Sequence, residues 1–270
     1  MSGESLAKRS QVIGTASCEL IRKIVKEEGF GHLLSTSIAI IRKFVVQIVA
    51  RPRFYFDGQW YKYAFHIYGK TWENERAVEL PIVVSYLQQR PSARILEVGN
   101  VLSHYTRINH TCVDKYERGR GVVNTDIVEY QPEAKFDLII CISTIEHIGV
   151  DDDPGHPWKV KQAIEKMISL LTEDGEIMMT FPIGYNLALD EIVRQGQYFT
   201  KARYLVRTTS DNQWRQVNYS SVKDSLFGSP FPFANALVVA GFEFGSRDRV
   251  STTSSLGRSK LRPVIRTVLD

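Results

Sequence analysis

The feature that most constrains the fold is a series of short apolar segments between residues 93 and 184. ARILEV, HTCVD, GVVNTDI and FDLIICIST follow one another, and EIMMTFPIG comes after a helix-like stretch over residues 160–171. FDLIICIST is apolar on both faces, which is typical of a strand buried inside a parallel sheet. Strands that alternate with connecting segments of this length predict an α/β protein with a doubly wound, mostly parallel, Rossmann-like sheet.

The segments on either side of this series are less regular. Residues 51–70 are rich in aromatic side chains and suit either a pair of strands or an irregular lid. Thr71 is expected to cap a helix that runs through Leu87. The helix should stop before Pro91, because a proline disfavours the helical conformation in the residue that precedes it. Further on, the pattern predicts a turn at residues 172–175 and two edge strands, YLVRTTS and ALVVAGFEF.

Charge is distributed unevenly along the chain. The formal net charge is +4, but residues 1–53 hold nine Lys/Arg against four Glu, and residues 246–270 hold six Lys/Arg against two Asp. The basic ends indicate either attraction to phosphate, lipid or an acidic partner, or simply solvated termini. We expect an amphipathic, aromatic extension over residues 1–70, a main domain over residues 71–245 and a flexible basic tail.

Residues 33–50 form the most apolar stretch. Arg42 and Lys43 interrupt it, and a bilayer-spanning helix needs about 20 mostly apolar residues, so a span is not expected. As a helix, the stretch suits either the surface of a membrane or packing against its own domain or a partner subunit. Because no secretory signal is visible, we expect a cytoplasmic protein, either free or at the inner face of a membrane.

The sequence offers no clear metal site. The three cysteines, Cys18, Cys112 and Cys141, are widely spaced, which is typical of buried thiols in a reducing compartment. Residues 151–153 are consecutive aspartates, and adjacent side chains do not all point at one ion. The run also lacks the alternate spacing of a calcium loop. We therefore expect a solvated acidic cluster there and no bound metal.

Polar residues stand where the predicted strands end. Ligands of open α/β sheets bind outside the carboxyl ends of the strands, so these residues are candidates for a binding site. Three of them, Glu97, Asp114 and Asp126, are carboxylates on consecutive strands, and they can accept hydrogen bonds from ribose hydroxyls or an exocyclic amine. The other candidates at these strand ends are Gly99, Asn100, Lys115, Ile127, Ser143 and Thr144.

The loop after the first strand, EVGNVLS, holds a single glycine. Gly99 lets the backbone turn sharply and approach a ligand. A nicotinamide-binding enzyme needs G-x-G-x-x-G, which brings a helix N-terminus onto the pyrophosphate. The loop therefore favours a ligand without phosphates.

Five segments in order, LEVGN, VDKYE, NTDIVEY, FDLIICISTIEHIG and LLTEDGEIMMTFPIG, resemble the successive motifs of class I S-adenosylmethionine-dependent methyltransferases. The resemblance covers about residues 70–190. TWENERAVELP, EVGNVLSHY and PFPFANALVV are similar to a bacterial and archaeal subgroup often associated with glycan biosynthesis. The family implies a Rossmann-like fold and S-adenosylmethionine as the cofactor. This chain departs from the family in lacking the usual second and third glycines of the loop.

The resemblance also implies which part of the methyl donor each matched position contacts. In chain order these are Glu97 and Gly99 at the methionine half with Asn100 beside them, Asp114 at the ribose hydroxyls with Lys115 beside it, Asp126 at the adenine amine, the Ile127 backbone beside the adenine ring, and Ser143 and Thr144 beside the sulfonium. Arg76, at the start of the preceding helix, is a further candidate, either as partner of the donor carboxylate or in a structural ion pair.

Methyl transfer from a sulfonium is an in-line displacement, so the protein mainly positions the partners and excludes water. A hydroxyl acceptor also benefits from a base, and histidine suits that role near neutral pH. His147 follows the fourth strand and is the best candidate, ahead of His104 and His156. The alternative is structural: Glu146 and His147 cap the next helix or hold the pocket together.

The acceptor is defined less well by the sequence. The aromatic run suits either a wall for stacking a sugar or an ordinary half-buried strand; its members are Tyr61, Tyr63, His66 and Tyr68. The central body has no dense Lys/Arg stripe interleaved with aromatics, so nucleic acid is not the expected substrate. The sequence predicts a methyltransferase acting on an oxygen of a sugar or lipid-linked glycan. The alternatives are a non-catalytic methyltransferase-fold module, for scaffolding or membrane attachment, and a nicotinamide enzyme.

Overall fold

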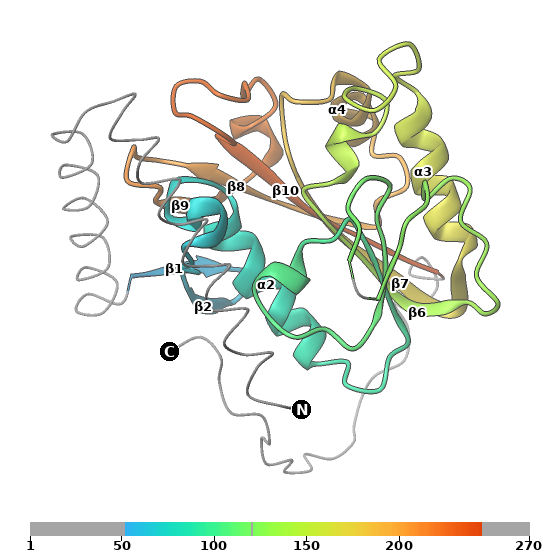
Figure 1. The fold of residues 1–270 in the computed structure, drawn as a ribbon. Helices are drawn as coiled ribbons and strands as arrows, with labels where there is room; N and C mark the ends of the chain where they lie inside the picture. The colour runs from blue at the N-terminus through green and yellow to red at the C-terminus, as the bar shows by residue number, and fades with distance from the viewer. Residues whose placement is uncertain (1–51, 120, 245–270) are drawn as a thin grey trace, which may run out of the picture. The chain divides into compact units, whose positions relative to one another are not determined.

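The computed structural model describes residues 52–119 and 121–244. Within these residues the chain forms an eight-stranded sheet, in the order β5-β4-β3-β6-β7-β10-β8-β9, and a two-stranded hairpin, β1-β2 (Figure 1). The predictions for residues 33–50 and 246–270 and for Cys18 lie outside the described residues. No helix in the described part of the chain has the length and apolar character needed to cross a bilayer.

Five neighbouring strands of the sheet are parallel. They are β3 (Ile95–Val98), β4 (Thr111–Val113), β5 (Val122–Val123), β6 (Phe136–Ile142) and β7 (Leu171–Pro182). The chain begins in the middle with β3, steps outward through β4 to β5, and crosses back to β6 and β7. The reversal between β3 and β6 is the switch point at which open α/β sheets bind ligands. The predicted mostly parallel, Rossmann-like sheet is confirmed.

The other three strands are antiparallel. β10 (Ala236–Glu243) pairs with β7 on one side and with β8 (Lys201–Arg207) on the other, and β9 (Trp214–Val217) forms the edge. The prediction that the segments containing β8 and β10 are edge strands is therefore wrong. Apolarity identified them as strands, but pairing partners depend on the rest of the sheet.

The predicted turn at residues 172–175 is also wrong. β7 begins at Leu171, and its pairing with β6 shifts register between Phe136 and Leu138. The extra residues are taken up as an irregularity inside the ladder instead of a turn before it.

Helices cover both faces of the sheet (Figure 1). α2 (Arg76–Gln88) packs on one face, and α3 (Lys159–Ser169) and α4 (Leu187–Arg194) pack on the other. β6 is buried on both sides, as predicted, because successive side chains alternate: Ile140 joins the cluster under α2, whereas Ile139 joins the cluster under α3.

The start of α2 differs from the prediction. Thr71 is buried in a short 3-10 segment, η1 (Tyr68–Glu73), where its hydroxyl donates to Ala64 O at 3.0 Å. The helix begins at Arg76, whose N–H donates to the Asn74 side chain. The predicted end is confirmed, since α2 stops at Gln88. Three further 3-10 segments are η2 (Leu102–His104), η3 (Ile145–His147) and η4 (Tyr219–Ser221).

Residues 53–62 form a strand pair, one of the two structures expected for this region. β1 (Arg53–Phe56) and β2 (Gln59–Lys62) are joined by Asp57 and Gly58, whose φ values of 43° and 88° define the tight turn typical of hairpins. Asp57 N–H donates to the Gln216 side chain at 2.8 Å, so the hairpin contacts β9. The domain boundaries expected from the sequence stay predictions.

Two of the three cysteines lie within the described residues. Cys112 on β4 and Cys141 on β6 are free and buried, which agrees with the expectation of buried thiols. Burial raises the pKa of both thiols, so both stay protonated at neutral pH.

Candidate functional site

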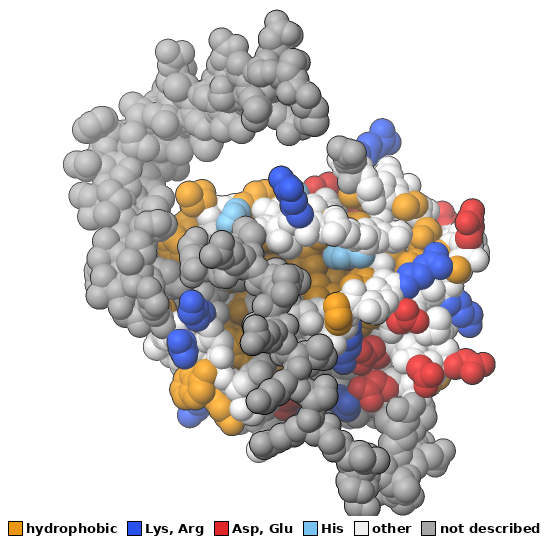
Figure 2. Space-filling view, turned by 90° about the horizontal axis from the view of Figure 1, so that it is seen from below, with side chains coloured by type: hydrophobic (Ala, Val, Ile, Leu, Met, Phe, Trp, Pro, Cys, Tyr) orange, Lys and Arg blue, Asp and Glu red, His pale blue; other side chains and the backbone are white. Residues whose placement is uncertain are grey.

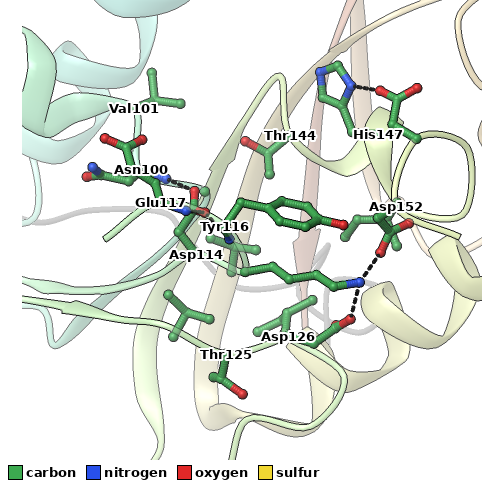
Figure 3. Close-up of a pocket in the computed structure, with 17 residues that line it drawn as sticks. Asn100, Val101, Asp114, Tyr116, Glu117, Thr125, Asp126, Thr144, His147 and Asp152 are labelled. Carbon is green, nitrogen blue, oxygen red and sulfur yellow. Dashed lines mark hydrogen bonds and ion pairs between the residues drawn. The ribbon is translucent and has the colours of Figure 1, made fainter. Parts of the chain in front are cut away.

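A pocket of about 440 Å³ lies at the carboxyl ends of β3, β4, β5 and β6 (Figure 3). This volume is in the range of small-molecule binding sites. Eight of the eleven residues predicted for the site line it: Gly99, Asn100, Asp114, Lys115, Asp126, Ile127, Thr144 and His147. Figure 3 shows Asp114 on one side of the pocket and His147 and Asp152 on the other.

Apolar side chains provide much of the pocket wall. Val98 and Val113 end their strands, and Ile127 and Ile148 follow β5 and β6. The apolar lining of the pocket suits a ligand that combines a flat apolar ring with a few polar groups. Figure 2 shows one face of the molecule, on which hydrophobic side chains are exposed beside acidic and basic ones.

Glu97 does not line the pocket. Its side chain is fully buried, and its Oε1 accepts the backbone N–H groups of Val101 at 3.0 Å and Leu102 at 2.7 Å. Its Oε2 lies 2.7 Å from His110 Nε2. Glu97 therefore fixes the loop that follows β3 from beneath.

Arg76 and Ser143 also lie outside the pocket lining. Arg76 Nη1 lies 2.5 Å from Glu79 Oε2, and its Nη2 donates to Ser143 O at 3.5 Å. Ser143 Oγ donates to the other oxygen of Glu79 at 2.6 Å. Burial alone would lower the pKa of Arg76, but Glu79 and Glu75 raise it, so the guanidinium stays charged. These residues form a structural ion-pair cluster between α2 and the end of β6.

Asp114 joins two loops of the pocket. Its Oδ2 accepts the N–H of Asn100 at 2.9 Å, and its Oδ1 accepts the N–H groups of Tyr116 at 2.8 Å and Glu117 at 2.7 Å. Each carboxylate oxygen has two lone pairs, so Oδ2 keeps one for a ligand hydroxyl. Glu117 and Tyr116 line the pocket and were missed, although both stand in the quoted VDKYE motif.

Four charged side chains, Lys115, Asp126, Asp152 and Lys159, form an alternating ring at one end of the pocket. Figure 3 shows Asp126 and Asp152 of this ring, each joined by a dashed line to the same lysine side chain. Lys115 Nζ lies 2.8 Å from Asp152 and 3.3 Å from Asp126, and Lys159 Nζ lies 2.9 Å and 2.8 Å from the same two carboxylates. The ring connects the loops after β4 and β5 to the start of α3. Asp152 and Lys159 were not predicted, because they come 26 and more residues after Asp126 in the chain.

The ring fixes the charge state of its members. Burial alone would raise the pKa of Asp126 and of Asp152, but hydrogen bonds from Lys159 and Lys115 outweigh it. The pKa of Asp126 is lowered, and that of Asp152 is lowered to about 2. All four groups are therefore ionised at neutral pH, and the ring carries no net charge.

The three consecutive aspartates have three different partners. Asp151 pairs with His147, Asp152 belongs to the ring, and Asp153 Oδ1 lies 2.8 Å from His156 Nδ1. Asp151 and Asp153 are exposed to solvent, as expected. Asp152 differs from the expectation, since its side chain is almost fully buried and pairs with two lysines.

His147 lies at the rim of the pocket with its side chain 47% exposed. Its Nδ1 contacts Asp151 Oδ2, and its ring makes a T-shaped contact with the Tyr185 ring, with centroids 4.9 Å apart. The residue does not cap the next helix, because α3 begins only at Lys159. Glu146, beside it, is buried; its Oε2 has no hydrogen-bond partner, and burial raises its pKa well above the usual range.

The other two candidate histidines lie elsewhere. His104 lies 2.9 Å from Glu117 and stacks on Tyr68 with ring centroids 4.3 Å apart. His156 is exposed on the loop before α3. The aromatic run is divided, because Tyr63 is buried against Phe54 in the core. It therefore does not form one continuous wall at the pocket.

No family model matches the chain, and no curated protein matches it. Solved structures of methyltransferases resemble it at low identity. N-methyltransferase NodS from Bradyrhizobium japonicum, in complex with S-adenosyl-L-homocysteine, is 14% identical over 61% of this chain and 87% of that chain, with a TM-score of 0.38. A possible histamine N-methyltransferase from Thermotoga maritima is 14% identical over 61% and 89%, with a TM-score of 0.37. The 1,6-didemethyltoxoflavin-N1-methyltransferase of Burkholderia thailandensis is 16% identical over 71% and 99%, with a TM-score of 0.34.

Proposed function

We propose that this chain is an S-adenosylmethionine-dependent methyltransferase whose donor binds in the pocket at the ends of β3, β4, β5 and β6. The main support for the proposal is that predicted site residues from different strand ends lie together. Eight residues selected from strand-end positions in the sequence, spread from Gly99 to His147, line a single pocket of about 440 Å³. An open α/β sheet binds its ligand at this position.

The residues of the pocket suit a nucleoside that carries no phosphate. The apolar side chains of Val113 and Ile127 offer surfaces for an adenine ring, and Asp114 keeps a free lone pair for a ribose hydroxyl. The loop after β3 has one glycine and leads only into η2, which has three residues. It therefore lacks the helix N-terminus that holds a pyrophosphate in dinucleotide enzymes.

The remaining donor contacts follow from these positions. Asp126 Oδ1 accepts the N–H of Val128 at 3.0 Å, and a second lone pair of that oxygen is assigned to the adenine amine. Gly99 and Asn100 follow β3 and Thr144 follows β6, and we place the methionine half and the sulfonium beside these three residues. Glu97, Arg76 and Ser143 act through the loops that they hold. When bound, the donor supplies a methyl group on a positively charged sulfur.

We further propose that the acceptor is an oxygen of a sugar or of a lipid-linked glycan. Support comes from the sequence resemblance and from His147, which is half-exposed at the rim of the donor pocket and is suited to accept a hydroxyl proton. The basic, amphipathic residues 33–50 support attachment to a membrane surface. Vesicle sedimentation of the full chain, compared with a chain lacking residues 1–50, tests the attachment; equal partitioning would contradict it.

Transfer of a labelled methyl group tests the activity. The protein is incubated with methyl-labelled S-adenosylmethionine and separated glycan and lipid extracts. We expect label in the glycan or lipid-linked fraction and its loss in His147→Ala. Label in nucleic acid or protein instead would contradict the proposed acceptor.

One observation favours a second candidate, a non-catalytic binding module of the same fold. The carboxylates of Asp114 and Asp126 already accept hydrogen bonds from this chain, and Lys115 bridges Asp126 and Asp152. The donor has to compete with these contacts. A protein that binds the demethylated donor but transfers no label to any extract would support this candidate over the enzyme.

A further inference from the structure

Three side chains at the rim of the pocket form a connected series. Tyr185 Oη donates to Asp151 Oδ2 at 2.7 Å. The same oxygen contacts Nδ1 of His147, and a dashed line at His147 in Figure 3 marks this contact. His147 ends η3, Asp151 follows four residues later, and Tyr185 comes from the loop between β7 and α4. Asp151 lines the pocket and Tyr185 does not, and neither residue is assigned a contact with the donor.

We propose that Asp151 and Tyr185 are positioning residues that hold the neutral His147 ring with its proton on Nδ1, so that Nε2 stays free to take a proton from the acceptor hydroxyl. This inference rests on the proposed methyltransferase function. The hydrogen bond at one ring nitrogen decides which nitrogen of a neutral imidazole carries the proton. Here the contact is at Nδ1, and a carboxylate can only accept.

The surroundings of His147 favour the tautomer with the proton on Nδ1 over the tautomer with the proton on Nε2. Glu146 Oε1 lies 3.9 Å from Nε2, beyond hydrogen-bond distance, and the buried Glu146 carboxyl has a raised pKa that favours its neutral form. Asp151 keeps its charge, because the Tyr185 hydroxyl and His147 lower its pKa. Lys115 and Asp152 neutralise each other within the ring. The negative charge next to His147 is therefore on the Nδ1 side.

Packing holds the series in place. The Tyr185 ring makes a T-shaped contact with His147 and a perpendicular contact with Phe227, the latter with centroids 4.8 Å apart. Burial and the hydrogen bond to Asp151 raise the pKa of Tyr185, so its hydroxyl remains a donor. The orientation of His147 is thus set before any acceptor arrives, which lowers the entropic cost of the reaction.

Methyl transfer to the acceptor hydroxyl forms one bond, breaks one bond and releases one proton. The acceptor oxygen forms a bond to the methyl carbon as the bond from that carbon to sulfur breaks, and the sulfonium becomes a neutral sulfide. The hydroxyl proton passes to His147 Nε2. The resulting imidazolium is stabilised by Asp151 and loses its proton to solvent, to which the ring is exposed.

Nitrogen NMR of the full chain tests the proposal without a known acceptor. The protein is labelled with ¹⁵N-histidine, and His147→Gln assigns the His147 signals among the six histidines. At a pH where the ring is neutral, we expect the Nδ1 resonance at the protonated position and the Nε2 resonance at the unprotonated position. In Asp151→Ala the two shifts should exchange, and in Tyr185→Phe they should move part of the way.

Asp153→Ala is the matched control, because it removes the carboxylate that pairs with His156 and should leave the His147 signals unchanged. A wild-type His147 with its proton on Nε2 would overturn the proposal, and so would an unchanged tautomer in Asp151→Ala. Calorimetry of the wild-type sample with S-adenosylhomocysteine separates the two ideas. If S-adenosylhomocysteine does not bind but the His147 ring has the expected tautomer, the methyltransferase function is contradicted and the positioning role of Asp151 and Tyr185 is not.

Discussion

The α-carbon of Gly99 lies directly against the side chain of Thr144. A β-carbon at position 99 would lie 2.1 Å from Thr144 Oγ1 and 2.7 Å from Thr144 Cβ, and Gly99 has a φ of +85°. The loops after β3 and β6 therefore meet at the switch point with no space for a side chain. This contact explains why the loop holds a glycine at this position.

Gly99→Ala should destabilise the protein by about 2–5 kcal/mol. Alanine in the left-handed backbone conformation costs about 1–2 kcal/mol, and the overpacked contact with Thr144 costs about 1–3 kcal/mol. Chemical denaturation measures the change. Gly58→Ala is the matched control, because Gly58 has a φ of +88° with no atom near its missing β-carbon, and it should cost only the backbone part. Equal losses in both variants would show that Thr144 does not restrict position 99.

Asp114→Ala should weaken binding of S-adenosylhomocysteine by at least about tenfold, or ~1.4 kcal/mol, because the variant loses the acceptor assigned to the ribose. Calorimetry on the folded variant measures the loss. Asp137→Ala provides the comparison, since Asp137 also accepts a backbone N–H, that of Arg94, but at the start of β6. Wild-type affinity in Asp114→Ala would remove the ribose assignment.

Lys159→Met should destabilise the protein by roughly 1–3 kcal/mol, because Asp126 and Asp152 would then share one cation. The loss should shrink as the pH falls toward 2 and the carboxylates take up protons, since the pKa of Asp152 is about 2 in the wild type. Lys161→Met, which removes an exposed lysine 3.9 Å from Glu165, should have almost no effect. A similar loss in both variants would mean that the ring does not hold the pocket together.

Asp190 should make the stability of the protein fall as the pH rises, whereas the ring carboxylates, whose pKa values are lowered, have the opposite effect. Burial raises its pKa from 3.8 to about 6, and its Oδ1 has no hydrogen-bond partner. Between these values the folded state binds more protons than the unfolded state, so this group lowers stability as the pH rises from about 4 to 6. Allowing for solvent screening, Asp190→Asn should gain roughly 1–2 kcal/mol relative to the wild type over that range. A stability difference that is constant from pH 4 to 7 would contradict this account.

Strand-end reasoning located most of the pocket because one rule applies to every parallel strand. Gly99 and Asp114 follow β3 and β4 directly, and Thr144 and Asp126 come two and three residues after the ends of β6 and β5. The carboxyl ends of parallel strands share one edge of the sheet. Glu97 was also predicted to line the pocket, and it does not. It lies within β3 instead of after it, so its side chain is covered by the loop and accepts that loop's N–H groups.

Pairings between distant side chains were not accessible in the same way. Asp152 meets Lys115 and Tyr185 meets Asp151 across 37 and 34 residues of chain. No periodicity links such positions, because the folded loops alone bring them together. The inner position of β10 was missed for a similar reason: an apolar strand pattern does not specify its neighbours.

The central claim is that the pocket binds a nucleoside bearing a sulfur centre and no diphosphate. Titration calorimetry of the full-length protein with S-adenosylhomocysteine, and separately with NAD, tests it most directly. We predict saturable, one-to-one binding of S-adenosylhomocysteine and no measurable heat with NAD. Binding of NAD, or no binding of S-adenosylhomocysteine at millimolar concentration, would contradict the account.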